Sequence, residues 1–252
     1  MVNTEARLLI LDQITEAFRQ KKKLFAALLD PEKTTNTENA EFLTKLPEFT
    51  THILVGGSTA TYEQTKTCID YLKSHTELPV VLFPGSHNQL VAGADALLFL
   101  SLLSGRNADY IIGEQVKAVP FLIENPVEVI PTAYILIDGG TRSSVARVSN
   151  TCPMPNKATK KLVHTALAGE YGGKKLIYLE AGSGAAYPVS IRVIEAVCKA
   201  VKIPVIVGGG IKTREQADDI YKAGAQMVVV GNALENKIFK GYAHEHSRKS
   251  NA

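Results

Sequence analysis

The stretch PVIVGGGIKTREQADDIYKAGAQMVVVGN, residues 204–232, has the pattern of a strand, a helix and a second strand. The runs Pro204–Val207 and Gln226–Val230 are apolar and rich in β-branched residues, as strands are. Between them Arg214–Ala223 has helical spacing, and Thr213 and Gln216 have the spacing of a capping box. This order predicts two parallel strands joined by a right-handed crossover.

The same alternation continues over the rest of the chain. Six more apolar runs lie at Leu24–Leu29, His52–Val55, Pro79–Phe83, Ala96–Leu102, Val129–Ile137 and Lys175–Leu179. Most are apolar throughout, as expected of strands that are covered on both faces. Helical spacing separates them at Tyr62–Lys73, Arg106–Ile123, Lys157–Ala168 and Ile191–Val201. A chain of 252 residues is close to the roughly 250 of one (β/α)8 barrel. We therefore expect residues 1–252 to form a single TIM barrel of the α/β class.

Two end segments lie outside the repeat. An amphipathic helix is predicted from about Arg7 to Arg19, with an apolar side formed by Leu8, Leu11, Ile14 and Phe18. We expect this extra N-terminal helix to plug the amino-terminal end of the barrel. The tail from His244 to Ala252 is polar and should fray.

The third crossover is short. Only Pro84–Asp95 separates the third strand from the fourth, and a full helix with two loops barely fits there. We predict that the third helix is truncated or replaced by an extended segment. Its loss would leave a groove beside the fourth strand, which is unusually apolar at Leu97, Leu98, Phe99, Leu100, Leu102 and Leu103. Either a long hydrocarbon lies in this groove, or a loop covers the gap with nothing bound.

Composition excludes several classes of protein. Hydrophobic residues make up 45% and charged residues 21%, so a disordered or fibrous chain is excluded. The net charge of +3 is small and the basic run Lys21–Lys23 is short, so we expect no nucleic-acid partner. The apolar run Leu8–Leu11 is too short for a signal peptide or a transmembrane segment, which favours a cytoplasmic protein. Cys68, Cys152 and Cys198 stand far apart and are expected to be reduced.

Glycines follow the last two strands. The seventh strand ends in Gly208-Gly209-Gly210-Ile211, and the eighth ends in Gly231-Asn232 just before a helix. In a TIM barrel a phosphate commonly lies at the loops after these two strands. Glycines let backbone N–H groups approach an anion, and the start of a helix adds a favourable partial charge. Two such loops favour a phosphate site over two merely tight turns.

The sixth strand ends in Tyr178-Leu179-Glu180-Ala181-Gly182-Ser183-Gly184. Alternation places Tyr178 and Glu180 on the face opposite Leu179, so they point into the barrel mouth if Leu179 packs outward. Glu180 is then a candidate general base, and Ser183 and Gly184 can add N–H donors to a phosphate. A structural Glu180 paired with a lysine is the alternative, which the position at a functional rim disfavours.

An aspartate follows the first strand. Asp30 lies in Leu28-Leu29-Asp30-Pro31, and Ser58 follows the second strand after two glycines. Mg²⁺ is usually held by one or two carboxylates together with substrate phosphates, so Asp30 and Ser58 are candidate ligands. Asp30 is equally placed to cap the helix that begins after Pro31.

Six segments, taken in order, resemble one family over essentially the whole chain: Leu29-Asp30-Pro31, Val55–Thr59, Phe83–Ser86, Tyr178–Gly184, Gly208–Ile211 and Gly231-Asn232. They are similar to the geranylgeranylglyceryl phosphate synthase family. Tyr178–Gly184 is the most family-specific segment, whereas many phosphate-binding barrels share the glycine loops.

The resemblance implies a Mg²⁺-dependent prenyltransferase. Such an enzyme forms an ether bond between sn-glycerol 1-phosphate and geranylgeranyl diphosphate, the first step committed to archaeal-type membrane lipids. The resemblance further implies that Asp30 and Ser58 bind Mg²⁺ and that Glu180 and Tyr178 are catalytic, with Glu180 near the attacking hydroxyl. The implied glycerol phosphate site is Tyr178, Leu179, Glu180, Ala181, Gly182, Ser183, Gly184, Gly209, Gly210, Gly231 and Asn232.

Related enzymes leave alternatives open. The similar heptaprenylglyceryl phosphate synthases commonly have a lysine where this chain has Leu28, which favours the geranylgeranyl branch. A phosphosugar isomerase or cyclase would share the glycine loops but needs no hydrocarbon groove. A non-catalytic phosphate-binding barrel would make Glu180 or Asp30 dispensable. The resemblance also implies a homo-oligomer, either a dimer or a hexamer, with at most transient contact with a membrane.

Overall fold

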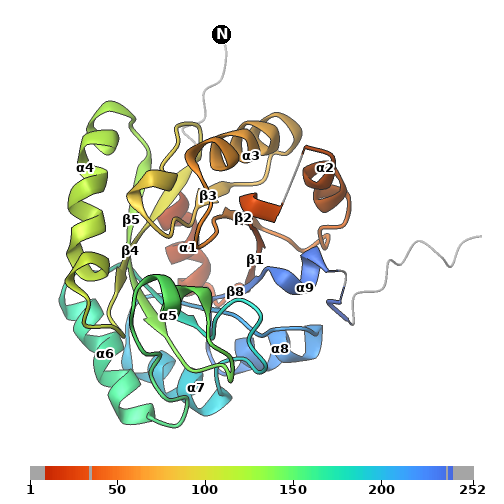
Figure 1. Cartoon of the computed structure of the whole chain (residues 1–252). Helices are drawn as coiled ribbons and strands as arrows, with labels where there is room; N and C mark the ends of the chain where they lie inside the picture. The colour runs from red at the N-terminus through yellow and green to blue at the C-terminus, as the bar shows by residue number, and fades with distance from the viewer. Residues whose placement is uncertain (1–8, 34–35, 237, 241–252) are drawn as a thin grey trace, which may run out of the picture.

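The structure, a computed structural model, describes residues 9–33, 36–236 and 238–240. Eight parallel strands close into a barrel in chain order (Figure 1). They are β1 (Leu24–Leu29), β2 (His52–Val55), β3 (Val80–Leu82), β4 (Ala96–Leu102), β5 (Glu128–Leu136), β6 (Leu176–Glu180), β7 (Val205–Gly208) and β8 (Met227–Val230). Pairing of β1 with β8 closes the ring. The predicted TIM barrel is confirmed.

Helices surround the strands. The longer ones are α2 (Asn36–Thr44), α3 (Tyr62–His75), α4 (Glu114–Glu124), α6 (Thr159–Tyr171), α7 (Ile191–Ala200) and α8 (Arg214–Lys222). Shorter elements are η1 (Pro31–Lys33), α5 (Ser144–Val148), α9 (Asn232–Glu235) and a π-helical turn, η3 (Asp109–Gly113), that leads into α4. The capping boxes that begin α3 and α8 have both reciprocal hydrogen bonds.

The predicted N-terminal plug is present as α1 (Ile10–Arg19). Ile10 and Ile14 pack among side chains that point into the barrel, such as Ala26 of β1. The helix begins at Ile10, and the predicted start at Arg7 and Leu8 lies outside the described residues. The backbone N–H groups of Ile10 and Leu11 donate to the Glu128 carboxylate at 2.6 and 2.8 Å, so a negative charge lies at the positive end of the helix. The predicted tail from His244 also lies outside the described residues.

The third outer helix is missing, as predicted. Between β3 and β4 there is only η2 (His87–Gln89), a single 3₁₀ turn. In Figure 1 the outer ring therefore passes from α3 to α4 with only this short element between them. Gln89 holds the segment against the end of β2, because its side-chain amide donates to Gly57 O at 2.9 Å and accepts from Gly85 N at 2.7 Å.

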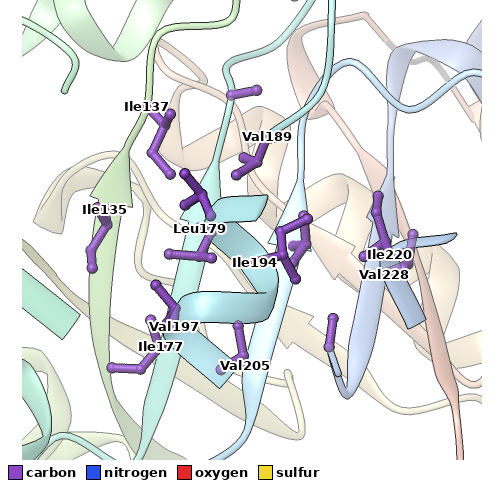
Figure 2. Packing of buried hydrophobic residues seen from close by; sticks show 14 of the residues in the cluster. Ile135, Ile137, Ile177, Leu179, Val189, Ile194, Val197, Val205, Ile220 and Val228 are labelled. Atoms are coloured by element: carbon purple, nitrogen blue, oxygen red, sulfur yellow. The ribbon is translucent and has the colours of Figure 1, made fainter. Parts of the chain in front are cut away.

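Apolar side chains form layers inside and outside the strands. Figure 2 shows the outer layer around β6, where Ile177 and Leu179 face Ile194 and Val197 of α7. Each fully buried aliphatic side chain contributes about 1.5–3 kcal/mol, so this layer fixes which face of β6 points outward. The alternate residues Tyr178 and Glu180 must then face the interior. Among the described residues, we find no helix with the length and apolar character needed to cross a membrane.

Candidate active site

A continuous cavity of about 540 Å³ opens at the carboxyl ends of the strands. Its polar part is bounded by the loops after β1, β2, β6, β7 and β8. An apolar arm of this cavity is lined inside the barrel by Leu98, Leu100 and Leu102, which belong to the inner core. Beside the missing helix it is lined by Leu90, Leu97, Phe99 and Ala118, which belong to the outer core. The predicted groove beside β4 is therefore present, and the loop does not close it. Leu103, which the sequence analysis named with the apolar residues beside this groove, does not line it. Its side chain packs in the outer core beside α6.

Glu180 ends β6 and points into this cavity, as alternation predicted. Only 4% of the residue is exposed, and its Oε1 accepts a 2.6 Å hydrogen bond from Gly182 N. Burial raises the pKa of the carboxyl to about 7, although the hydrogen bond from Gly182 and the nearby Tyr178 hydroxyl act in the opposite direction. No cation among the described residues contributes to this pKa, which argues against a structural pair with a lysine.

Tyr178 lies beside Glu180 within an aromatic cluster. Its ring stacks on Phe83 with centroids 5.1 Å apart, and the Tyr134 ring lies 5.4 Å away. Burial and the nearby carboxylate raise the pKa of Tyr178 well above its usual value. The hydroxyl lies near Glu180, but it makes no hydrogen bond of ordinary geometry within the described part of the chain. A buried hydroxyl without such a bond is costly, so a ligand in the cavity would supply the missing partner.

The glycine loops and the loop after β6 meet at one side of the cavity. Gly184 and Gly209 have φ values of +71° and +82°, which favour glycine. The Ser183 hydroxyl donates to Asn232 Oδ1 at 3.1 Å, joining the loop after β6 to the start of α9. The cavity is lined by the predicted phosphate residues Gly182, Ser183, Gly184, Gly209, Gly210, Gly231 and Asn232. The structure thus brings three separate predicted segments together.

Two members of the predicted glycerol phosphate set have side chains that face outward. The side chains of Leu179 and Ala181 belong to the outer core, away from the cavity (Figure 2 for Leu179). The Ala181 N–H donates to Gly208 O at 3.0 Å. The physical reason is the two-residue period of the strand, which sends these side chains toward α7. Neither side chain can contact a ligand in the cavity.

Asp30 satisfies the capping alternative. Its Oδ1 accepts from Glu32 N at 3.2 Å and its carbonyl oxygen accepts from Lys33 N at 3.0 Å, so it begins η1. The carboxylate also fills the space above Gly57, next to Ser58, and both Asp30 and Ser58 line the cavity. Among the described residues no three His, Cys, Asp or Glu side chains form a metal cluster. The oxygen donors present nevertheless fit Mg²⁺, which takes one or two carboxylates and completes its shell with water and substrate phosphate.

A lysine links Asp30 to α9, and the sequence did not reveal it. Lys33 Nζ lies 3.1 Å from Asp30 Oδ2, 3.4 Å from Glu235 Oε2 and 3.3 Å from Asn232 Oδ1. Lys33 and Glu235 both line the cavity. The sequence shows only that Lys33 follows Asp30 by three residues. Its contacts with Asn232 and Glu235, near the other end of the chain, could not be inferred from that spacing.

A second charged group borders the apolar arm. His87 of η2 contacts Glu114 of α4 through its backbone N–H at 2.8 Å and its ring Nδ1 at 2.7 Å. Lys117 Nζ lies 2.8 Å from the other oxygen of Glu114. Partial burial acts to raise the pKa of Glu114, but the contacts with Lys117 and His87 outweigh it and lower the pKa to about 2. This pair fastens η2 to α4 beside the arm, and sequence reasoning did not identify it.

Comparison with known proteins places the chain in a family. The PcrB family model matches residues 16–246, a span that contains every residue of the cavity described above. The chain belongs to the PcrB family. This membership agrees with the resemblance found in the motifs from Asp30 to Asn232.

Similar curated proteins of the PcrB family are named geranylgeranylglyceryl phosphate synthase. That of Zunongwangia profunda is 52% identical, with 92% of this chain and 99% of the relative covered. That of Flavobacterium johnsoniae is 48% identical, covering 89% and 93%. The Pyrococcus horikoshii protein is 40% identical, covering 91% and 89%.

Solved structures agree with this family. The (S)-3-O-geranylgeranylglyceryl phosphate synthase of Thermoplasma acidophilum, in complex with its substrate sn-glycerol-1-phosphate, has a TM-score of 0.84 at 36% identity, covering 90% of this chain and 92% of its own. The enzyme of Thermoplasma volcanium has a TM-score of 0.83 at 38% identity, covering 92% and 93%. A tryptophan synthase α-subunit from Pyrococcus furiosus, with a TM-score of 0.54 at 16% identity, shares the fold alone.

Proposed function

We propose that this PcrB family member is a geranylgeranylglyceryl phosphate synthase. It joins the 3-hydroxyl of sn-glycerol 1-phosphate to geranylgeranyl diphosphate through an ether bond. The observation that carries the proposal is the continuity of the cavity, which links the glycine loops to an apolar arm beside β4. A phosphosugar isomerase would need the first part and not the second. The substrates named for similar enzymes agree with both parts.

The glycine loops hold the glycerol phosphate. Ser183, Gly184, Gly209 and the start of α9 at Asn232 converge where a phosphate commonly lies in this fold. A phosphate fixed there directs the glycerol hydroxyl toward the Glu180 carboxylate deeper in the mouth. Holding the hydroxyl in line with its target lowers the entropic part of the barrier.

Glu180 accepts the proton. A pKa of about 7 leaves a substantial ionised fraction at neutral pH, which suits a general base. The hydroxyl oxygen bonds to C1 of the prenyl group, the bond from C1 to the diphosphate oxygen breaks, and diphosphate leaves with the electron pair. The hydroxyl proton passes to Glu180. The neighbouring Tyr178 hydroxyl can donate to a substrate oxygen, which would satisfy its missing hydrogen bond.

Asp30 and Ser58 would hold Mg²⁺. The carboxylate lies above Gly57, the residue before Ser58, and the strand β8 separates β1 from β7 with its glycine loop. A magnesium ion held there would neutralise the charge on the leaving diphosphate.

The apolar arm holds the prenyl chain. Each buried CH₂ is worth about 0.8 kcal/mol, so affinity should rise with chain length until the arm is filled. Leu28 lines the cavity near the carboxyl end of β1, with its Cβ close to Gly231. An apolar side chain at this position accords with the geranylgeranyl branch.

We further propose that the chain forms a homo-oligomer through α4. An exposed apolar stripe, Ile112, Val116, Val119 and Ile123, runs along the outside of this helix and of the π-helical turn before it. Successive residues of this stripe are separated by four, three and four positions, so the pattern is unchanged when the helix direction is reversed. A twofold axis would therefore place Ile112 against Ile123 of the partner subunit and Val116 against Val119 of the partner subunit, as an isologous interface requires.

The activity can be tested directly. The purified protein is incubated with sn-glycerol 1-phosphate, Mg²⁺ and prenyl diphosphates of ten, fifteen, twenty and thirty-five carbons, and the ether products are measured by mass spectrometry. We expect the twenty-carbon product at the highest kcat/KM and none without metal. sn-Glycerol 3-phosphate serves as the matched control substrate. A preferred thirty-five-carbon product would indicate a heptaprenyl enzyme, and no ether product with any diphosphate would refute the proposal.

A further inference from the structure

The Lys33 ammonium group occupies a central place in the cavity that the reaction above leaves unexplained. It contacts the carboxylates of Asp30 and Glu235 and also Asn232 Oδ1, which in turn accepts from the Ser183 hydroxyl. The ammonium group thus lies between the residues proposed for the metal and those proposed for glycerol phosphate. It belongs to η1, whereas two of its partners belong to α9, so it also joins the two ends of the barrel chain.

The two carboxylates that hold Lys33 are themselves held together. Asp30 N donates to Glu235 Oε1 at 3.1 Å, and the two acidic side chains are only 18% and 12% exposed. The Lys33 side chain is 48% exposed, so its head can move into the cavity without unpacking the core. The Lys33 side chain is therefore a charged group that can move, whereas the Asp30 and Glu235 carboxylates that bind it are more buried.

An ammonium ion and a divalent metal compete for the same oxygen. Lys33 Nζ is bound at Asp30 Oδ2, one of the oxygens that Mg²⁺ would need. A metal ion that arrives alone must displace the ammonium group from Asp30, and Glu235 then holds the displaced positive charge close to the metal. Diphosphate changes this balance, since its oxygens bind both the metal and the displaced ammonium group.

We propose that Lys33 is a resident counterion that keeps divalent metal off Asp30 until a diphosphate is present. Metal and diphosphate then enter as one unit, and Lys33 moves from Asp30 to the phosphate oxygens. This inference rests on the proposed function of Asp30 as a metal ligand. Lys33 acts here as a positioning residue, and its replacement changes metal binding in a direction that simple loss of structure would not produce.

Calorimetry with Mn²⁺ alone tests the competition. Lys33→Met keeps the length and removes the charge, and we expect it to bind Mn²⁺ about three- to tenfold more tightly than the wild type, as loss of two ion pairs would allow. The same variant should bind Mg²⁺-pyrophosphate more weakly than the wild type, because the ammonium contact with phosphate is gone. Lys33→Arg keeps the charge and should leave Mn²⁺ affinity near the wild-type value.

Lys212→Met is the matched control. Lys212 lines the same cavity, but its Nζ contacts the Ala186 carbonyl oxygen at 3.4 Å. An equal gain in Mn²⁺ affinity in this variant would mean that only the net charge of the cavity matters, and the inference would be wrong. Unchanged or weaker Mn²⁺ binding in Lys33→Met, with its circular dichroism spectrum and Tm unaltered, would overturn it too.

A double variant separates this inference from the function on which it rests. Asp30→Asn combined with Lys33→Met should lose the tight Mn²⁺ binding of Lys33→Met. If the double variant still binds Mn²⁺ as tightly, the ion is not at Asp30 and the metal assignment itself fails. If binding is lost with Asp30 but does not depend on Lys33, the metal assignment stands and only the counterion role is rejected.

Discussion

Glu180 lies at the end of β6, where burial is the main cause of its raised pKa. The folded protein holds this proton more tightly than the unfolded chain, whose carboxyl has the ordinary value of 4.5. The contribution of Glu180 to the free energy of unfolding is therefore fully present below pH 4.5 and is lost as the pH rises to about 7. Glu180→Gln should therefore be at least as stable as the wild type at pH 8, with no gain at pH 4.5, when unfolding is followed in urea.

The same substitution should lower kcat by about 10²- to 10⁴-fold, the usual contribution of a general base. In the wild type, kcat should rise with pH through about 7 and level off above it, because the ionised carboxylate is the active form. Retention of activity in Glu180→Gln, or a pH profile that is flat from 5 to 9, would mean that Glu180 is structural.

The Tyr178 hydroxyl is buried without a hydrogen bond of ordinary geometry in the described part of the chain. Removing such a group costs no stability in the free protein, so Tyr178→Phe should have a Tm equal to or above that of the wild type. If the hydroxyl donates to substrate, kcat should fall by about tenfold, the value of one hydrogen bond. Scanning calorimetry gives the Tm and steady-state kinetics give kcat. A lowered Tm together with a lowered kcat would contradict a role of the hydroxyl as a donor to substrate.

Asp30→Asn separates the two functions of this side chain. Asparagine caps a helix as well as aspartate does, so η1 should remain, whereas a neutral amide is a poor ligand for Mg²⁺. We expect loss of turnover and of Mg²⁺-pyrophosphate binding, with sn-glycerol 1-phosphate binding within about twofold of the wild type by calorimetry. Equal weakening for both ligands would point to a structural role alone.

Residues of the site differ in how far the sequence predicted them. Tyr178 and Glu180 followed from the period of one strand, and the glycine loops followed from their place after β7 and β8. Lys33 could not be assigned, because its contact with Glu235 spans 202 residues and depends on closure of the barrel. The outward direction of the Leu179 side chain does not follow from the family motif, since a motif is contiguous in sequence while a strand presents alternate residues to each face.

At the scale of elements, the boundaries of the strands were predicted within one residue, because runs covered on both faces are continuously apolar. The helix α2, NTENAEFLT, was not predicted, since its polar and apolar residues show little separation between faces. The truncated or replaced third helix was predicted from the segment Pro84–Asp95, which is short and contains a proline and two glycines. Its replacement η2 contacts α4 through His87 and Glu114, which chain length does not reveal.

The apolar arm left by this helix can be shortened. Leu100 lies on β4 and lines the arm, so Leu100→Trp should reduce kcat/KM for geranylgeranyl diphosphate relative to farnesyl diphosphate by about tenfold or more, since several buried CH₂ groups are at stake. Val129→Trp is the control, because Val129 on the adjoining strand is 37% exposed and does not line the cavity. An unchanged preference in a folded Leu100→Trp protein would place the hydrocarbon elsewhere.

At the scale of the whole molecule, the chain length and the alternation of strands and helices were enough to predict the barrel. The proposed oligomer interface could be located only from the exposure of side chains in the structure. Val116 is 63% exposed at the centre of the α4 stripe. Val116→Asp should convert an oligomer into smaller species in sedimentation velocity, because the twofold axis brings the new charges close together. Tyr171→Asp, at an 81% exposed position on α6, should leave the assembly unchanged. A wild-type monomer, or loss of the assembly in both variants, would contradict the proposed interface.

The hydrogen bonds between the start of α1 and Glu128 have a consequence for the order of folding. The two hydrogen bonds join residues 117 and 118 positions apart, so the amino-terminal end of α1 cannot be fixed until Glu128 of β5 has been synthesised. At about 5–20 residues per second, that interval is on the order of ten seconds. During it only the partners of α1 on β1 to β4, such as Ala26 and Leu54, are available to its apolar face. The helix α1 is thus synthesised well before the residue that fixes its amino-terminal end.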